Sequence, residues 1–281
     1  KRKKMSELFV YVNNDLIPAQ SAKLSITDLA IQRGYGIFDF LVVVKGSPVF
    51  LEDHLNRFYH SAAAMHLSVA LDKTALITAI HDLMNKNQLP NSGIRITLTG
   101  GDSPDGYSIG IPNLIITQNP FQYTYASPLK GIRLITHEHQ RQLPHIKTID
   151  YAKAIYLQPT IKAAGADDVL YHNAGIITEC PRSNFFIVNK KQEIITPDKQ
   201  VLAGVTRAKL LLNKQFVVKE EPIALEDLAN AEEAFITSST KNVLPVIAID
   251  GKPIGNGAPG PVTQQLLQWM IQEKGILFTN S

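Results

Sequence analysis

The chain has 281 residues, enough for one large domain or two domains of ordinary size. Its 44% hydrophobic and 19% charged residues are typical of a globular protein and argue against intrinsic disorder. The net charge of +3 comes from the basic run Lys1–Lys4, and the rest of the chain is close to neutral. This balance excludes the basic stripe of a nucleic-acid-binding protein. We expect residues 1–7 to be a disordered or artificial tail.

The single cysteine, Cys180, excludes an intrachain disulfide and a cysteine-based zinc cluster. No apolar run approaches the ~20 residues that span a bilayer, and we find no signal-peptide core. We therefore expect a cytoplasmic protein that has neither a membrane nor a nucleic acid as partner.

The first part of the chain reads as strands with two long helices between them. One helix is indicated by apolar residues that recur at spacings of three and four from Leu51 to Met65. A second helix is predicted over residues 72–87, and strands over 9–12, 37–44, 93–99 and 113–117. Residues 119–130 contain two prolines and no strong period, which predicts an interdomain linker.

The second part mixes shorter strands and helices. Strands are predicted over 131–136, 168–172, 176–179, 184–189 and 233–237, and helices over 151–164, 206–214 and from Gly260 onward. The elements lack a regular β-α-β rhythm, so the sequence favours an α+β fold over a doubly wound sheet. We expect a smaller N-terminal α/β domain over 8–118 and a larger, cofactor-binding C-terminal α/β domain over 131–281.

Three features suit a bound phosphate. Gly204 to Thr206 opens a helix with free backbone N–H groups, and Ser238 to Thr240 follows a strand with hydroxyl and N–H donors. Arg57 is a permanent cation that binds phosphate in a bidentate manner. Each feature also has an ordinary structural interpretation, as a helix cap, a turn or a solvated side chain.

Two further residues point to one cofactor. Lys147 lies between Ile146 and Ile149, which indicates partial burial, and a buried lysine is a candidate for Schiff-base chemistry. Glu179 ends an apolar strand, where a carboxylate can pair with a protonated ring nitrogen. A phosphate cradle, such a lysine and such a carboxylate together predict a pyridoxal 5'-phosphate site. The ordinary interpretations are a surface lysine and a turn carboxylate.

In this order the motifs are those of a known family. From about residue 8 to 275 the chain resembles the class IV (fold-type IV) pyridoxal phosphate aminotransferases, namely the D-amino-acid and branched-chain enzymes, with aminodeoxychorismate lyase as a relative. The resemblance rests on RGYGIFD (33–39), EDHLNR (52–57), IKTIDY (146–151), TE (178–179), RSNFF (182–186), LAGVTR (202–207), TSST (237–240), DGK (250–252) and GPVT (260–263).

The resemblance implies a role for each matching residue. Lys147 would form the internal aldimine and move the substrate proton, and Glu179 would bind the ring nitrogen. The phosphate would be held by Arg57, Val205, Thr206 and Thr240, with Ser239 nearby. Leu202 would pack on the ring, and Tyr151 would bond its phenolic oxygen, although the family's tyrosine lies one residue further from the lysine. The family fold implies two α/β domains with the cofactor between them, and a homodimer whose partner completes the substrate pocket.

Departures from the family pattern concern the substrate. D-amino-acid enzymes use an arginine and a histidine after the 93–99 strand, but Gly100 stands at the arginine position and no histidine follows. Phe38 matches a phenylalanine of the branched-chain enzymes. The substrate carboxylate could instead meet Arg33, Arg95 or Lys241. Arg33 could alternatively form a structural salt bridge with Asp28 or Asp39, and Lys241 could lie in a solvated loop.

The prediction is a ping-pong transaminase that moves an amino group from an amino acid to a 2-oxo acid. We expect the D-amino-acid type with a non-classical arginine site. The alternatives are a branched-chain L-amino-acid aminotransferase and then an aminodeoxychorismate lyase. Outside the enzymes, the alternative is a pseudoenzyme that keeps the fold and binds a partner.

Overall fold

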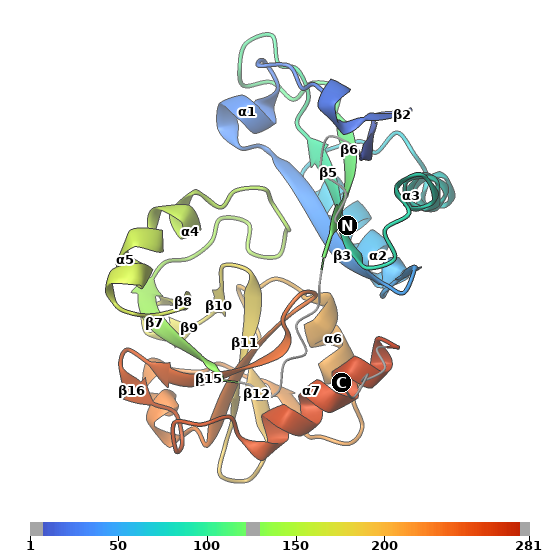
Figure 1. The fold of residues 1–281 in the computed structure, drawn as a ribbon. Coiled ribbons are helices and arrows are strands. Elements are labelled where there is room, and N and C mark those ends of the chain that lie inside the picture. Colours follow the sequence, from blue (N-terminus) through green and yellow to red (C-terminus); the bar gives the residue numbers. More distant parts are fainter. Residues whose placement is uncertain (1–7, 122–129, 276–281) are drawn as a thin grey trace. The chain divides into compact units, whose positions relative to one another are not determined.

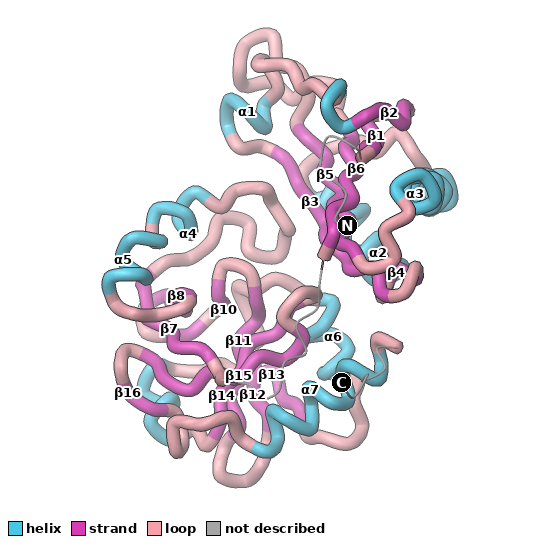
Figure 2. Tube along the Cα trace, in the orientation of Figure 1, coloured by secondary structure: helices cyan, strands magenta, loops and turns pink. Residues whose placement is uncertain are grey.

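The computed structural model describes residues 8–121 and 130–275. Within these residues the chain divides into two compact units (Figure 1). Unit 1 is the N-terminal part up to residue 121 together with the short segment 146–150. Unit 2 is the remainder, residues 130–145 and 151–275. Each unit is built on its own β-sheet, as the colouring of Figure 2 makes clear.

Unit 1 is an antiparallel six-stranded sheet of order β2-β1-β6-β5-β3-β4. Its strands are β1 (Phe9–Val12), β2 (Asp15–Pro18), β3 (Gly36–Val44), β4 (Ser47–Pro48), β5 (Ser92–Thr99) and β6 (Leu114–Pro120). Its helices are the 3-10 turn η2 (Ala19–Ser21), α1 (Leu29–Arg33), α2 (Leu51–Ala64) and α3 (Lys73–Asn87). The strands and long helices predicted for this part are confirmed, with ends shifted by a few residues.

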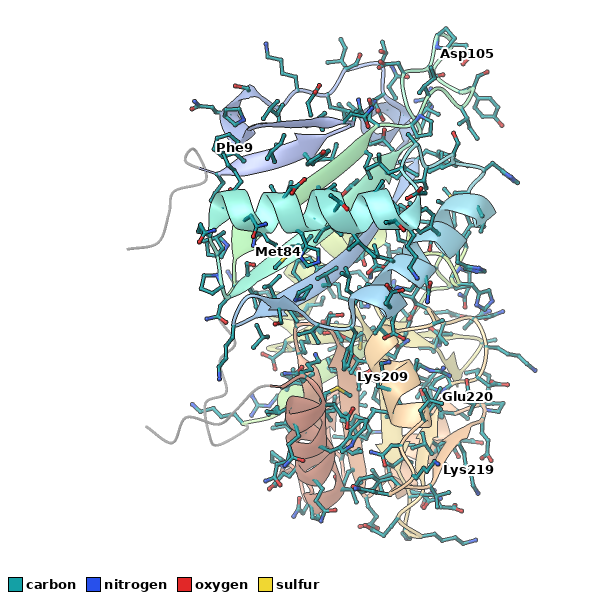
Figure 3. All side chains as sticks on the ribbon, turned by 90° about the vertical axis from the view of Figure 1, so that its right-hand side faces the viewer. Phe9, Met84, Asp105, Lys209, Lys219 and Glu220 are labelled. Atoms are coloured by element: carbon teal, nitrogen blue, oxygen red, sulfur yellow. The ribbon has the colours of Figure 1, made fainter. Side chains whose placement is uncertain are left out.

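The core of unit 1 lies between the sheet and the helices α2 and α3 (Figure 1). Alternate residues of β3 point to this side, and they meet the buried apolar stripe of α2 that includes Leu55 and Phe58. Asp72 caps α3 by accepting the Ala75 N–H at 2.8 Å. Phe9 of β1 and Met84 of α3 pack against the same core (Figure 3).

Segment 146–150 belongs to unit 1 because it pairs with the start of β3. The carbonyl of Lys147 accepts the Phe38 N–H at 3.0 Å, and the carbonyl of Gly36 accepts the Ile149 N–H at 3.0 Å. The predicted second domain, 131–281, includes this segment, so the structure differs there. Hydrogen bonds between residues so far apart in the sequence produce no periodic pattern, so this pairing could not be predicted. The tail 1–7 and most of the predicted linker lie outside the described residues.

Unit 2 is a mixed ten-stranded sheet whose main order is β13-β12-β11-β14-β15-β7-β8-β9, with β10 paired to β11 and β16 to β15. Its strands are β7 (Ile132–Glu138), β8 (Asp168–Asn173), β9 (Ile176–Ile177), β10 (Glu179–Cys180), β11 (Ser183–Val188), β12 (Ile194–Thr196), β13 (Val218–Glu220), β14 (Glu233–Ser238), β15 (Asn242–Ile249) and β16 (Lys252–Pro253). Its helices are α4 (Ala152–Tyr156), α5 (Gln158–Ala163), α6 (Val205–Leu211), the 3-10 helix η3 (Leu225–Asn230) and α7 (Pro261–Glu273).

Two predictions for unit 2 need correction. The single helix predicted over 151–164 is two short helices, because Pro159 near the start of α5 has no N–H to continue the ladder. Strand β15 was not predicted, since Pro245 argues against a central strand. The structure accommodates Pro245 because β7 pairs with β15 only from Val246 onward.

The α+β fold of two α/β domains is confirmed. Unit 1 is wholly antiparallel, and in unit 2 parallel pairs such as β7 with β8 stand beside antiparallel hairpins. In the described part of the chain no helix is long and apolar enough to cross a membrane.

Candidate active site

Lys147 lies on unit 1, held by backbone contacts to β3 and α2. Its carbonyl accepts from Phe38, its N–H donates to Ser61 Oγ at 3.4 Å, and its neighbour Ile146 is buried. Gly36 permits close approach on both sides, because a Cβ there would lie 3.1 Å from Ile149 Cδ1 of this segment and 2.8 Å from the Leu98 carbonyl oxygen of β5. The fixed backbone leaves the long side chain of a half-buried lysine in a defined place.

The ring of Phe38 is contacted by two cations. The Lys147 Nζ lies 4.5 Å from the ring centre, and the Arg95 Cζ lies 3.8 Å from it. The register of β3 and β5 pairs Phe38 with Thr97, so Arg95 stands diagonally across from Phe38 on the same face. The Arg95 Nε also donates to Thr97 Oγ1 at 3.3 Å. Such cation–π contacts hold both cations near the ring.

Arg57 is held by a buried carboxylate. Its Nε and Nη2 donate to the two oxygens of Asp39, each at 2.8 Å, and His54 Nδ1 lies 2.7 Å from the same Asp39. Burial alone would raise the pKa of Asp39, but the charges and hydrogen bonds of Arg57 and His54 outweigh it and hold that pKa well below its ordinary value. Asp39 therefore fixes the position of the guanidinium predicted to bind phosphate.

Arg33 lies at the exposed end of α1. Its Nη1 donates to the Gln32 carbonyl at 3.1 Å, and it forms no ion pair with Asp28 or Asp39 in the described part of the chain. Asp28 is already engaged, because it accepts from Thr99 Oγ1 at 2.6 Å and from Asn113 Nδ2 at 2.9 Å. The structural salt bridge considered as an alternative for Arg33 is therefore not found.

The loop after β5 begins at Gly100, where the resemblance places the carboxylate-binding arginine of the D-amino-acid enzymes. It is ordered by Asp105, whose Oδ1 accepts from Ser103 Oγ at 2.9 Å and from the Ser108 N–H at 2.7 Å. Asp105 lies at the outer end of this loop (Figure 3). In this loop Asp105 is thus a carboxylate that already accepts hydrogen bonds from the loop itself, and not a cation that could bind the substrate carboxylate.

Glu179 is buried in unit 2, at the start of the β10–β11 hairpin, and three groups hold it. The Arg141 Nη1 lies 2.6 Å from Oε1, while Oε2 accepts from Asn184 Nδ2 at 3.2 Å and from the Leu202 N–H at 3.1 Å. Asn184 reaches Glu179 because the hairpin pairs these two residues directly. The carboxylate is therefore fixed in direction and faces a permanent positive charge.

The start of α6 is linked to this carboxylate through Asn184. Asn184 Nδ2 donates to the Leu202 carbonyl at 2.8 Å, and a Cβ at Gly204 would lie 2.0 Å from Asn184 Oδ1. Val205 and Thr206 follow as the first residues of α6, and both are buried. The hydroxyl of Thr206 is buried and has no hydrogen-bond partner in the described structure, which is rare for a buried polar atom.

The remaining predicted residues of unit 2 lie at the β14–β15 turn and before α4. The side chains of Ser238 and Thr240 are 3.4 Å apart, and Lys241 Nζ donates to Asp168 Oδ2 at 3.0 Å. Lys241 is thus ion-paired and not the solvated loop residue considered as its alternative. Tyr151 directly precedes α4, and its carbonyl accepts the Ile155 N–H at 3.0 Å.

Sequence analysis missed several residues of this site. Arg141 gave no signal, because nothing in the local sequence connects it with Glu179. Asp39 was considered only as a salt-bridge partner of Arg33. Asn184 lay in a quoted motif without a role, although its short hairpin spacing from Glu179 was a usable signal. Cys180 is fully buried and burial raises the pKa of its thiol, so it has no features of a nucleophile.

Comparisons with known proteins identify the family of the chain. Residues 36–249 match the family model described as amino-transferase class IV. The chain is 28% identical over 267 residues to a D-alanine aminotransferase of Bacillus licheniformis, covering 92% of this chain and 94% of the relative. It is 29% identical over 271 residues to a putative branched-chain-amino-acid aminotransferase of Methanocaldococcus jannaschii, covering 92% and 93%.

Solved structures show the same fold. A branched-chain amino acid aminotransferase from Escherichia coli superimposes with a TM-score of 0.87 at 22% identity, covering 98% of this chain and 97% of that chain. The enzyme of the same name from the archaeon Thermoproteus uzoniensis, solved with norvaline, gives 0.85 at 23% identity, covering 96% and 95%. A third branched-chain amino acid aminotransferase, solved with pyridoxamine 5'-phosphate, gives 0.89 at 22% identity, covering 98% and 96%.

The chain belongs to the class IV aminotransferase family. The predicted enzyme class is thereby confirmed, and with it the pyridoxal phosphate dependence of that family. The residues present fit the cofactor. The orphaned Thr206 hydroxyl can donate to a phosphate, and the fixed Glu179 can accept from a ring N–H. Lys147 can supply the amine that the cofactor's aldehyde requires.

Proposed function

We propose that this aminotransferase moves amino groups from D-amino acids to 2-oxo acids by a ping-pong reaction, and that Arg95 binds the substrate carboxylate. The observation that carries the proposal is the shared contact of Arg95 and Lys147 with the ring of Phe38. It holds a permanent cation close to the amine that reacts. A substrate whose Cα is within reach of Lys147 would therefore have its carboxylate near Arg95.

Each residue has a task in this reaction. Bound pyridoxal phosphate supplies an aldehyde that takes up amino groups and a protonated ring that accepts electrons. Lys147 would hold that aldehyde and would move the proton at the substrate Cα. Glu179, fixed by Arg141, holds the proton on the ring nitrogen. As the family resemblance implies, Leu202 would pack on the ring and Tyr151 would bond its phenolic oxygen.

Each unit offers candidate ligands for the phosphate. Unit 1 offers Arg57, oriented by Asp39, and unit 2 offers Val205, Thr206, Ser239 and Thr240. Buried N–H and hydroxyl donors at a helix start suit an anion. That both groups contact one cofactor, as the family resemblance implies, remains a prediction.

A second cation is available for the carboxylate. Arg33 is exposed and free of carboxylate partners in the described structure, whereas Lys241 is already paired with Asp168. We assign Arg33 to the pocket of a second copy of the chain. A carboxylate gains ~1.5–3 kcal/mol per charged hydrogen-bond partner, so Arg33 and Arg95 together change substrate affinity by ~10²–10⁴.

An exposed apolar patch supports the homodimer. It consists of Ile26 and Ile31, near α1, with Tyr107, Ile109 and Ile111 of the loop after β5. The two segments are joined by bonds from the Leu29 N–H to the Gly101 carbonyl and from the Ser103 N–H to the Thr27 carbonyl. Ile26, Tyr107 and Ile111 are 79%, 86% and 89% exposed, which is unfavourable in a monomer. A second copy would cover the patch beside Arg33.

Branched-chain L-amino acids are the second candidate substrates. The observation in their favour is the apolar ring of Phe38 beside Lys147, which suits an aliphatic side chain. The relatives include enzymes named for both substrates. The pseudoenzyme is a weaker alternative, because the chain keeps Lys147 and a fixed Glu179, which pyridoxal phosphate chemistry requires. A lyase that depends on the same cofactor needs the same two residues and stays the third candidate.

The test is an absorbance spectrum of the protein with pyridoxal phosphate, before and after D-alanine, D-glutamate or L-leucine. Loss of the visible band with the D-amino acids alone supports the proposal, and loss with L-leucine alone moves the chain to the branched-chain group. Arg95→Gln should raise the D-alanine concentration for half-maximal loss by at least ~10-fold. Arg133→Gln, at an exposed arginine of β7, is the matched control.

A further inference from the structure

A lysine continues the buried side of α7. This helix packs against β14 and β15, and its buried residues include Leu266, Met270 and Ile271. Lys274 follows Met270 by four residues, so it falls on the same face, and only 7% of it is exposed. A lysine so deeply buried is unusual and normally has a partner.

The partners of Lys274 lie at the two ends of the β14–β15 turn. Its Nζ donates to the Ser239 carbonyl at 3.0 Å and to Asn242 Oδ1 at 2.5 Å. Ser239 begins the three-residue loop between the strands, and Asn242, with φ +56°, follows it in the left-handed conformation that such hairpins use. One amine therefore ties both ends of this loop together.

This contact sets the direction of a peptide group. In a trans peptide the carbonyl of one residue and the N–H of the next point in opposite directions. Because the Ser239 carbonyl turns toward Lys274, the Thr240 N–H turns away from it. Within the described residues that N–H has no acceptor, so it is available for an anion.

The charge of Lys274 is also not neutralised within the protein. In the described part of the chain it forms no ion pair with a carboxylate. Burial lowers the pKa of its amine to about 7. A buried amine without an acidic partner beside a loop of N–H and hydroxyl donors is what an anion-binding turn requires.

We infer that Lys274 is a positioning residue for the cofactor phosphate, which it serves by holding the Ser239–Lys241 loop with the Thr240 N–H turned outward. The inference rests on the proposed function, because it takes Ser239 and Thr240 as phosphate ligands. Lys274 itself acts through the loop and is not a catalytic residue.

The test compares two ligands of the cofactor-free protein, pyridoxal 5'-phosphate and pyridoxal, by absorbance titration. Lys274→Met should weaken pyridoxal phosphate binding about 10-fold and leave the Kd of pyridoxal within about 2-fold. Lys252→Met, at an exposed lysine of β16, should change neither Kd. If Lys274 had only a general structural role, its replacement would raise the Kd values of both ligands by the same factor.

Equal weakening of both ligands, or no weakening of either, would overturn the inference. Wild-type protein that binds pyridoxal phosphate no better than pyridoxal would refute the proposed phosphate site as well, so the two failures are distinguishable. If circular dichroism shows that Lys274→Met does not fold, Lys274→Gln is judged by the same ratio of Kd values.

Discussion

Arg141 and Glu179 form a nearly buried ion pair, with Nη1 2.6 Å from Oε1, although 38 residues separate them in the chain. Removing two charges from water costs several kcal/mol, so the pair persists only with good geometry and further hydrogen bonds. Asn184 and the Leu202 N–H provide those bonds to the other oxygen of Glu179. The ion pair is therefore part of a polar network that fixes Glu179, as the proposed contact with the cofactor ring requires.

Replacing Arg141 by Met should lower the free energy of unfolding by about 3–5 kcal/mol, because it leaves a buried charge unpaired. Glu179→Gln in the same chain should recover part of that loss, since it removes the unpaired charge. Urea denaturation of the two single variants and the double variant measures the coupling. Strictly additive losses would contradict an energetic link between the two side chains.

Asp39→Asn should destabilise unit 1 in a pH-dependent way. The pKa of Asp39 is lowered in the folded protein, so between that value and its unfolded value of 3.8 the unfolded chain binds more protons. The stability that Asp39 contributes is thus complete above about pH 5 and is lost as the solution becomes more acidic. The difference in Tm between wild type and variant should be constant from about pH 5 to 8 and shrink toward about pH 3. A constant difference at all pH values would refute the assignment.

The predictable parts of the molecule were those with a local pattern. The apolar stripe of α2 predicted that helix, and the IKTIDY and LAGVTR motifs pointed to Lys147 and Thr206. The positions of these residues in the fold did not follow, because they depend on distant pairings such as that of segment 146–150 with β3.

The partners of the site residues were the least predictable. Arg141, Asp39 and Lys274 act on groups far away in sequence, and each is a single charged residue without periodicity. Strand β15 was missed because Pro245 argues against a central strand. It is accommodated because β7 does not pair with β15 at that residue, which is a property of register.

Lys147→Ala should abolish transamination, with a loss of about 10³-fold or more, because the variant loses the amine that anchors the cofactor's aldehyde and moves the substrate proton. Cofactor binding through the phosphate should remain measurable. Single-turnover absorbance changes with D-alanine or L-leucine test the expectation, and Lys162→Ala, at an exposed lysine of α5, is the control. Wild-type turnover by Lys147→Ala would remove the lysine from the mechanism.

Ile111→Lys should convert the proposed dimer to monomers at micromolar concentration, because it places a charge in the apolar patch near α1. Leu212→Lys changes an equally apolar residue of unit 2 that is 74% exposed, and should leave the assembly unchanged. Sedimentation velocity distinguishes the two states. Wild-type protein that sediments as a monomer, or a dimer that survives Ile111→Lys, would show that this patch is not the interface.

Lys274 should make the free energy of unfolding depend on pH, as Asp39 does, but through the cost of a buried charge rather than through a favourable charge pair. Burial lowers its pKa to about 7, against 10.5 in the unfolded chain, so between these values the unfolded state binds more protons. Below about pH 7 the amine is charged in both states and the full burial penalty applies. Stability should therefore rise with pH between about 7 and 10, by roughly 2–5 kcal/mol in all.

Lys274→Met lacks this titration and should be more stable than wild type at about pH 6, with the advantage shrinking toward about pH 9.5. Differential scanning calorimetry across that range measures both chains, with Lys252→Met as the exposed control. An advantage that does not change with pH would mean that the amine is not buried as the structure shows. A bound phosphate that neutralises the amine should reduce the stability advantage of Lys274→Met at about pH 6. Saturating pyridoxal phosphate should therefore reduce this advantage more than saturating pyridoxal does, because only the phosphate brings a compensating negative charge to the loop.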